Sequence, residues 1–299
     1  MWLFLGIISA LLLGSYEVSK KVSVHENAVI PVLFSSIFIS SLILLPFLLI
    51  SSFAPAWLEG GIFFVPQVDF KTHLLILVKS TIVLSSWLFA YFAMKNLPLT
   101  LAAPIKATQP VLVVLGGVLI FGEQLNGFQI GGISITLVSF FMFSLIGKKE
   151  GYVFGKNKWI WFIIMATVTG ATSGLYDKYL MGQFNHMAVQ VYYTFYQVIM
   201  MAVITFTLWY PTRKKTTPFR FRWSIVFISI LLVSSDFVYF YALTLPDSLI
   251  SVLGTVRRAG VIVPFIYGAL VLRDKYLKLK MIDLIGVLIG MLLLYFGSR

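Results

Sequence analysis

The chain has 299 residues, of which 59% are hydrophobic and 11% charged, whereas an average soluble domain has about 45–50% and about 25%. This composition excludes an ordinary soluble fold, and ten membrane spans of about 20 residues each leave too little chain for an extramembrane catalytic domain. The net charge of +12 does not indicate nucleic-acid binding, because the basic residues stand in short runs between apolar stretches, where membrane topology accounts for them.

Ten apolar stretches are long enough to cross a bilayer as helices, and breaks rich in proline, glycine, asparagine and charge separate them. The first begins at Trp2 and is followed by Lys20 and Lys21, the reverse of the charge order of a secretory signal, so we expect a retained helix. The predicted helices are 2–22, 28–50, 73–95, 98–121, 127–147, 158–181, 188–210, 223–244, 247–272 and 279–297.

An internal repeat relates the two halves of the chain. A displacement of 160 positions places Gly14-Ser-Tyr-Glu17 on Gly174-Leu-Tyr-Asp177, and a displacement near 151 places Lys106 on Arg257. These matches predict two five-helix repeats. Because five is an odd number, the second repeat would cross the membrane in the opposite sense to the first, with a binding site between them near the midplane.

The fold class that we predict is therefore an all-α membrane protein of ten transmembrane helices, arranged as two inverted five-helix repeats. The expected repeats are residues 1–150 and 151–299. Glycine pairs in Gly127–Gly131 and Gly286–Gly290 predict close helix packing, either within the fold or in a homodimer, so a monomer and a homodimer both remain open.

Basic residues between the predicted helices are distributed unevenly. Three of them, Lys71, Lys178 and Arg299, fall on one side of the predicted topology, whereas sixteen fall on the other. Positive charge marks the cytoplasmic side, so both termini should lie outside the cytoplasm. The sixteen are Lys20, Lys21, Lys95, Lys148, Lys149, Lys156, Lys158, Arg213, Lys214, Lys215, Arg220, Arg222, Arg273, Lys275, Lys278 and Lys280.

One long segment resembles a known family. The stretch Ser86-Trp-Leu-Phe-Ala-Tyr-Phe-Ala-Met-Lys-Asn-Leu-Pro-Leu-Thr-Leu-Ala-Ala-Pro-Ile-Lys106, continuing to the Gly-Glu pair that ends at Glu123, is similar to the third and fourth helices of EamA-type transporters of the drug/metabolite transporter superfamily. Val256-Arg-Arg-Ala-Gly260 and Leu272-Arg-Asp274 resemble the equivalent places in the second half. The resemblance covers essentially the whole chain. It implies export or exchange of small metabolites across a bacterial inner membrane.

Seven ionisable side chains fall at membrane depth, where they are costly and usually face a cavity or one another. They are Glu17, Lys79, Lys106, Asp177, Asp236, Arg257 and Arg258.

The two arginines stand near the middle of the ninth predicted helix, and we expect at least one of them, Arg257 first, to point into the bundle. Lys106 is its counterpart in the repeat and follows Pro104, which is expected to bend the helix. These groups either anchor a substrate carboxylate or phosphate, or form structural ion pairs with Asp236 and Glu17.

Glu17 and Asp177 occupy matching places, each after a tyrosine, Tyr16 and Tyr176. They are candidates for paired gates or proton-coupling groups, with interfacial groups as the alternative. Asp236 lies deeper and is a candidate to bind a substrate amine or to carry a proton.

Lys79 stands within about two turns of the end of its predicted helix, so we expect its ammonium group to reach the membrane surface. Gly260 and Pro264 predict a hinge or a static kink in the ninth helix.

Two groups of side chains are candidates for the wall of the cavity. Gln190, Tyr193 and Gln197 form a polar stripe on the seventh predicted helix, and Trp87 and Tyr91 form an aromatic one on the third. Packing against lipid or other helices is the alternative for the aromatic pair.

The predicted function is secondary transport of a small polar metabolite, amino-acid-like or an organic anion, by alternating access. Coupling to protons through Asp236 or Glu17 and uncoupled exchange both remain open. A flippase for lipid-linked sugar phosphates and a multidrug exporter are the alternatives. No enzyme, metal or cofactor is expected, because the chain has no cysteine and its three histidines form no ligand cluster.

Overall fold

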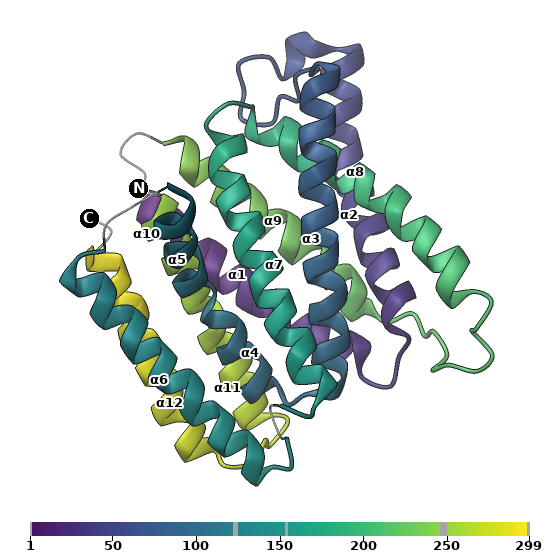
Figure 1. The fold of residues 1–299 in the computed structure, drawn as a ribbon. Coiled ribbons are helices and arrows are strands. Elements are labelled where there is room, and N and C mark those ends of the chain that lie inside the picture. The colour runs from purple at the N-terminus through teal and green to yellow at the C-terminus, as the bar shows by residue number, and fades with distance from the viewer. Residues whose placement is uncertain (1, 122–124, 153–154, 246–249, 298–299) are drawn as a thin grey trace.

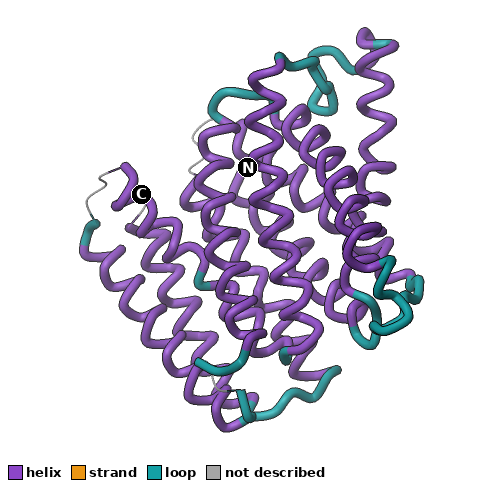
Figure 2. The backbone as a smooth tube through the Cα atoms, turned by 45° about the vertical axis from the view of Figure 1, so that its right-hand side comes forward, coloured by secondary structure: helices purple, strands orange, loops and turns teal. Residues whose placement is uncertain are grey.

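The computed structural model describes residues 2–121, 125–152, 155–245 and 250–297, and within those ranges it is helical with no strand (Figures 1 and 2). Nine helices of the described chain are long and apolar enough to cross a membrane, and α4 with α5 occupies the tenth predicted position. The helices are α1 Trp2–Val24, α2 Val29–Phe53, α3 Phe70–Asn96, α4 Leu99–Ala107, α5 Gln109–Phe121, α6 Gly127–Lys149, α7 Lys158–Met181, α8 His186–Ile204, α9 Trp223–Thr244, α10 Ile250–Arg258, α11 Ile262–Leu270 and α12 Leu277–Gly297.

Two predicted helices are each broken into two pieces. The stretch 98–121 divides into α4 and α5 at Thr108, and the stretch 247–272 divides into α10 and α11 at a turn of 3-10 helix, Ala259–Val261. The bend expected near Lys106 and the hinge or kink expected at Gly260 and Pro264 are thus complete breaks in the α-helix. Pro110 and Pro264 lack the N–H group that would bond back four residues, so the carbonyls of Lys106 and Gly260 lose their usual partners. Both breaks leave basic residues in the last turn of a half-helix, where the helix dipole favours positive charge.

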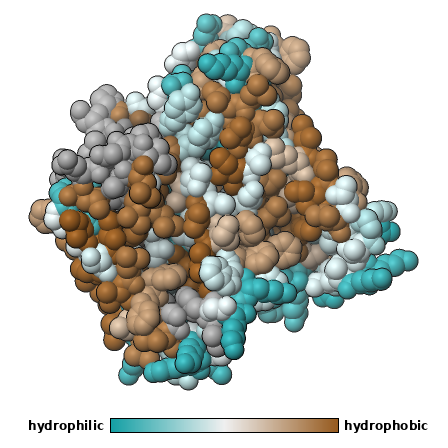
Figure 3. Space-filling view, viewed as in Figure 1, coloured by the Kyte–Doolittle hydropathy of each residue, from teal (hydrophilic) through white to brown (hydrophobic). Residues whose placement is uncertain are grey.

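Helices from the two halves of the chain pack against each other in reciprocal pairs. In the centre α1 packs on α9 and α3 on α7, while α2 packs on α8 at one side and α6 on α12 at the other (Figure 1). The surface between the two ends is broadly apolar, and hydrophilic side chains gather towards the ends (Figure 3). This is the surface that a multi-pass membrane protein presents to lipid.

Helix α1 begins and α12 ends at the same end of the bundle (Figure 1). The connectors 210–222 and 271–276 lie at the opposite end, which we call the basic end. Residues of this end are tied together by side chains: Asn27 bonds to the backbone of Arg220, and Lys95 donates to Thr217 Oγ1 at 2.9 Å. Which side of the membrane it faces stays a prediction.

Glycines allow the backbones of α6 and α12 to touch. A Cβ atom added at Gly290 would lie 2.1 Å from Thr136 Oγ1 and 2.8 Å from the Gly132 carbonyl oxygen. The predicted small face at Gly286–Gly290 therefore packs within the fold. On α6 the prediction is wrong in register, because Gly132 makes the close contact and Gly127 has nothing near it.

We expect Gly290→Val to lower the free energy of unfolding by about 1–3 kcal/mol, because the added side chain forces α6 and α12 apart. The measurement is the melting temperature of the detergent-purified protein. Gly127→Ala is the matched control and should melt like the wild type or slightly higher. Equal melting of Gly290→Val and the wild type would mean that the two helices are not in close contact.

Candidate functional site

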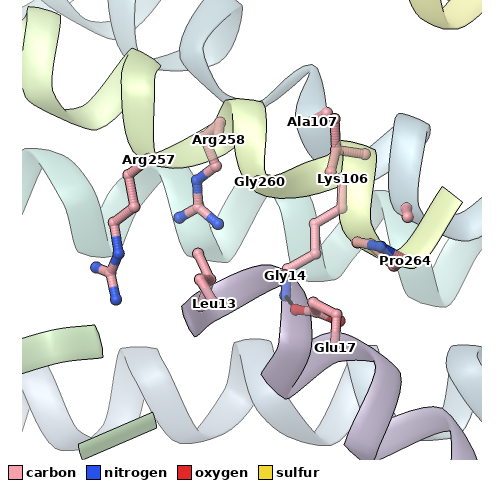
Figure 4. A pocket seen from close by; sticks show the side chains of 11 residues that line it. Leu13, Gly14, Glu17, Lys106, Ala107, Arg257, Arg258, Gly260 and Pro264 are labelled. Carbon is pink, nitrogen blue, oxygen red and sulfur yellow. Dashed lines mark hydrogen bonds and ion pairs between the residues drawn. The ribbon is translucent and has the colours of Figure 1, made fainter. Parts of the chain in front are cut away.

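A small pocket, with a cavity volume of about 30 Å³, lies where α1 meets the two helix breaks (Figure 4). Lys106 and Arg258 reach into it towards α1, which carries Leu13, Gly14 and Glu17. The lining residues are Leu13, Gly14, Glu17, Ala103, Lys106, Ala107, Arg257, Arg258, Gly260, Val261 and Pro264. The fold thus brings to one place four residues that the sequence marked out as isolated positions: Glu17, Lys106, Arg257 and Arg258.

Two glycines bring the broken helix against α1. A Cβ atom at Gly14 would lie 2.4 Å from the Gly260 carbonyl oxygen, and one at Gly260 would lie 2.1 Å from the Ala10 carbonyl oxygen. The backbones therefore meet without intervening side chains. Because Arg257 and Arg258 come just before this contact, the contact fixes their distance from α1.

Glu17 is buried between two ammonium groups. Its carboxylate accepts from Lys106 Nζ at 2.5 Å and pairs with Lys20 three residues along α1. Lys20 is fully buried, and its ammonium nitrogen lies 4.8 Å from the ring centre of Tyr16 and 5.3 Å from that of Tyr91. Glu17 is therefore not an interfacial group. Lys20 was predicted to belong to a connector, but its i, i+3 spacing from Glu17 is the sequence signal for this ion pair.

Asp236 is the partner of Arg257. Its carboxylate pairs with the guanidinium and also accepts from the Tyr193 hydroxyl at 2.7 Å. Arg257 further donates to Ser235 Oγ at 3.2 Å and lies 4.4 Å from the ring centre of Tyr239. Arg257 was expected either to anchor a substrate or to form a structural ion pair with Asp236, and the structure shows the ion pair.

Arg258 differs from its neighbour. Its guanidinium points into the pocket (Figure 4), and within the described chain no group forms a hydrogen bond or an ion pair with it. Around the pocket, Lys20, Lys106, Arg257 and Arg258 stand against the carboxylates of Glu17 and Asp236. The site therefore carries a formal excess of two positive charges.

A second buried pair lies farther along the bundle. Lys79 on α3 pairs with Asp177 on α7, and its ammonium nitrogen lies 5.1 Å from the ring centre of Tyr193 and 5.5 Å from that of Phe240. Lys79 is only 2% exposed, so the prediction that it reaches the membrane surface is wrong. The packing of α7 on α3 supplies a carboxylate at the same depth, which removes the need to reach water. Tyr176 donates to the Leu75 carbonyl oxygen at 3.2 Å and lies outside the pocket.

The two predicted wall groups lie outside this pocket. Gln190 donates to the Val233 carbonyl oxygen at 3.0 Å, and Gln197 is fully buried. Tyr91 is also buried, and Trp87 packs in the core between α2, α3 and α9. The predictions that these residues face a cavity are therefore not met by the pocket of the described chain, because neighbouring helices cover them.

The fold and the site together define a multi-pass membrane protein with a positively charged pocket between two broken helices. Residues 1–145 match the sequence model of the EamA-like transporter family. The first half of the chain therefore matches this family of the drug/metabolite transporter superfamily, whose members are membrane transporters. Glu123, which ends the resembling segment, lies outside the described residues.

Comparison with solved structures concerns the fold alone. A crystal structure titled only as that of a protein aligns with a TM-score of 0.63 over 98% of this chain and 96% of that chain, at 13% identity. No curated protein sequence matches the chain.

Proposed function

We propose that the protein is a secondary transporter for a small organic anion or an amino-acid-like zwitterion, which binds in the pocket through Arg258. The observation that carries the proposal is a guanidinium with no hydrogen-bond or ion-pair partner among the described residues, in a site with excess positive charge. A buried cation is costly unless it is paired, so a pocket of this kind favours an anionic occupant.

Alternating access of two inverted repeats is the mechanism that we propose. The reciprocal packing of α1 on α9 and α3 on α7, and the paired breaks after Lys106 and Arg258, support it. In many transporters, substrate sites near the midplane are formed by discontinuous helices at the interface between repeats, and transport follows from rocking of one repeat against the other. We further propose that the protein exports or exchanges its cargo in a bacterial inner membrane, with both termini outside the cytoplasm.

A thermal-shift screen of the detergent-purified protein tests the class of cargo. A ligand at about 100 times its dissociation constant stabilises the folded protein by roughly 2.7 kcal/mol. We expect carboxylates, zwitterions or phosphorylated metabolites to raise the melting temperature. A compound that does so should also be exchanged across the membrane of proteoliposomes that contain the protein. Shifts by sugars or cationic drugs alone would contradict an anion site. A shift by lipid phosphates alone, with none by water-soluble anions, would favour the flippase.

A further inference from the structure

Lys280, near the start of α12, is a fully buried cation outside the pocket lining. Its ammonium nitrogen donates to Glu150 Oε1 at 2.8 Å and to Thr100 Oγ1 at 2.9 Å. Glu150 ends α6, and Thr100 lies in the first turn of α4. One side chain of the second half of the chain is therefore held by two elements of the first half.

Thr100 extends the same network to the connector between α11 and α12. Its hydroxyl donates to Asp274 Oδ2 at 2.7 Å, and its backbone N–H donates to the same oxygen at 3.1 Å. The backbone N–H of Asp274 in turn donates to the Gly268 carbonyl oxygen at 3.1 Å. Four side chains, those of Thr100, Glu150, Asp274 and Lys280, thus tie the two halves together at the basic end. We call them the polar lock.

Helices α4 and α11 meet tightly beneath the polar lock. A Cβ atom at Gly268 would lie 2.9 Å from Thr100 Cγ2, 3.1 Å from Asp274 Oδ2 and 3.3 Å from Leu99 Cβ. Leu99, Ala102 and Phe265 are buried in one core cluster between these helices. The same two helices supply Ala103, Ala107 and Pro264 to the pocket wall, so an apolar seal and then the polar lock separate the pocket from the basic end.

We propose that the polar lock holds the pocket closed at the basic end and opens in each transport cycle, an assignment that rests on the proposed transport function. The chemistry of the four groups suits a reversible contact. Replacing a buried ion pair by apolar side chains is often neutral or stabilising, so a static joint has no need of a buried lysine. When such a contact opens to water, its charged groups regain hydration. An apolar contact of the same area gains no such hydration when it opens.

A cysteine reporter in the pocket tests the polar lock. The chain has no cysteine, so Leu13→Cys introduces the only thiol, on a partly exposed pocket residue. An anionic, membrane-impermeant methanethiosulfonate is applied to vesicles of each orientation. Trypsin cleavage of the exposed basic connector, at Arg213, Lys214 or Lys215, identifies the face of the vesicle that is the basic end.

Two variants disturb the polar lock by different means. Thr100→Val keeps the shape of the side chain and removes its hydrogen bonds to Asp274 and Lys280, and Gly268→Ala inserts a methyl group between α4 and α11. We expect each to raise the labelling rate from the basic end by on the order of tenfold, through a shift towards the open state. Thr167→Val is the matched control, since Thr167 is buried and its hydroxyl donates within its own helix to the Ile163 carbonyl oxygen. It should leave the rate unchanged.

Three results would overturn the proposal: rapid labelling of Leu13→Cys from the basic end with the lock intact, no change in either lock variant, or an equal rise from both ends. Should Thr100→Val fail to fold, Gly268→Ala and Asp274→Asn test the same point. Labelling needs no substrate. A labelling result that contradicts the polar lock therefore says nothing against the anion site. A ligand screen without hits likewise leaves the labelling result valid.

Discussion

Arg258→Gln is expected to weaken anion binding by roughly 10- to 100-fold while leaving the melting temperature almost unchanged. Arg257→Gln is expected to destabilise the fold instead, lowering the free energy of unfolding by about 3–5 kcal/mol. The difference follows from their partners. Within the part of the chain that the structure describes, removal of Arg258 leaves no group unpaired, whereas removal of Arg257 leaves the Asp236 carboxylate buried with the Tyr193 hydroxyl as its one remaining donor.

The two quantities are measured on the same preparations, as melting temperature without ligand and as affinity for the best anion of the screen. Arg258→Lys is the conservative control. It keeps the charge but loses the planar fork of donors, so we expect an affinity between those of the wild type and Arg258→Gln. Undiminished binding by Arg258→Gln would remove Arg258 from the site. If Arg257→Gln instead bound the anion more weakly and melted normally, Arg257 would be the residue that binds the substrate. The substrate would then have to displace Asp236 from Arg257.

The number and position of the membrane spans could be predicted because apolar length is a local property of the chain. The breaks in two of those spans had local signals as well, in Pro110 and in Gly260 with Pro264, but a proline in a membrane helix can bend it without dividing it. Whether the helix divides depends on what receives the freed carbonyls. Here the Gly260 carbonyl faces the backbone of α1 at Gly14. This contact joins two distant parts of the chain, so it could not be predicted from the local sequence.

The ionisable residues at membrane depth were visible in the sequence, and Glu17 and Asp236 were named there as alternative partners of Lys106 and Arg257, whereas Asp177 as the partner of Lys79 was not. Lys106 and Glu17 are 89 positions apart and Lys79 and Asp177 are 98 apart, so both pairs depend on how helices pack across the bundle. The same dependence explains the polar stripe on α8. Its spacing predicts one polar face, but a neighbouring helix can cover such a face as well as a cavity can. Gln190 donates to the Val233 carbonyl oxygen, whereas the Gln197 amide is buried with no hydrogen-bond partner in the described chain.

Lys79→Met is expected to lower the free energy of unfolding by about 3–5 kcal/mol, because it leaves the Asp177 carboxylate buried without its cation. The double variant Lys79→Met with Asp177→Leu removes both charges and should recover most of that loss. Melting temperatures of the two single variants and the double variant complete the cycle, and the coupling between the sites is their departure from additivity.

Lys71→Met, at the exposed start of the same helix, is the matched control and should change stability by no more than about 0.5 kcal/mol. If Lys79→Met also changed little, the ammonium group would have to reach water, as the sequence alone suggested. If the single variants cost much and the double variant recovered nothing, the cation contacts of Lys79 with Tyr193 and Phe240 would be what stabilises this part of the bundle. Recovery by the double variant singles out the pair itself, because both aromatic rings are present in every member of the cycle.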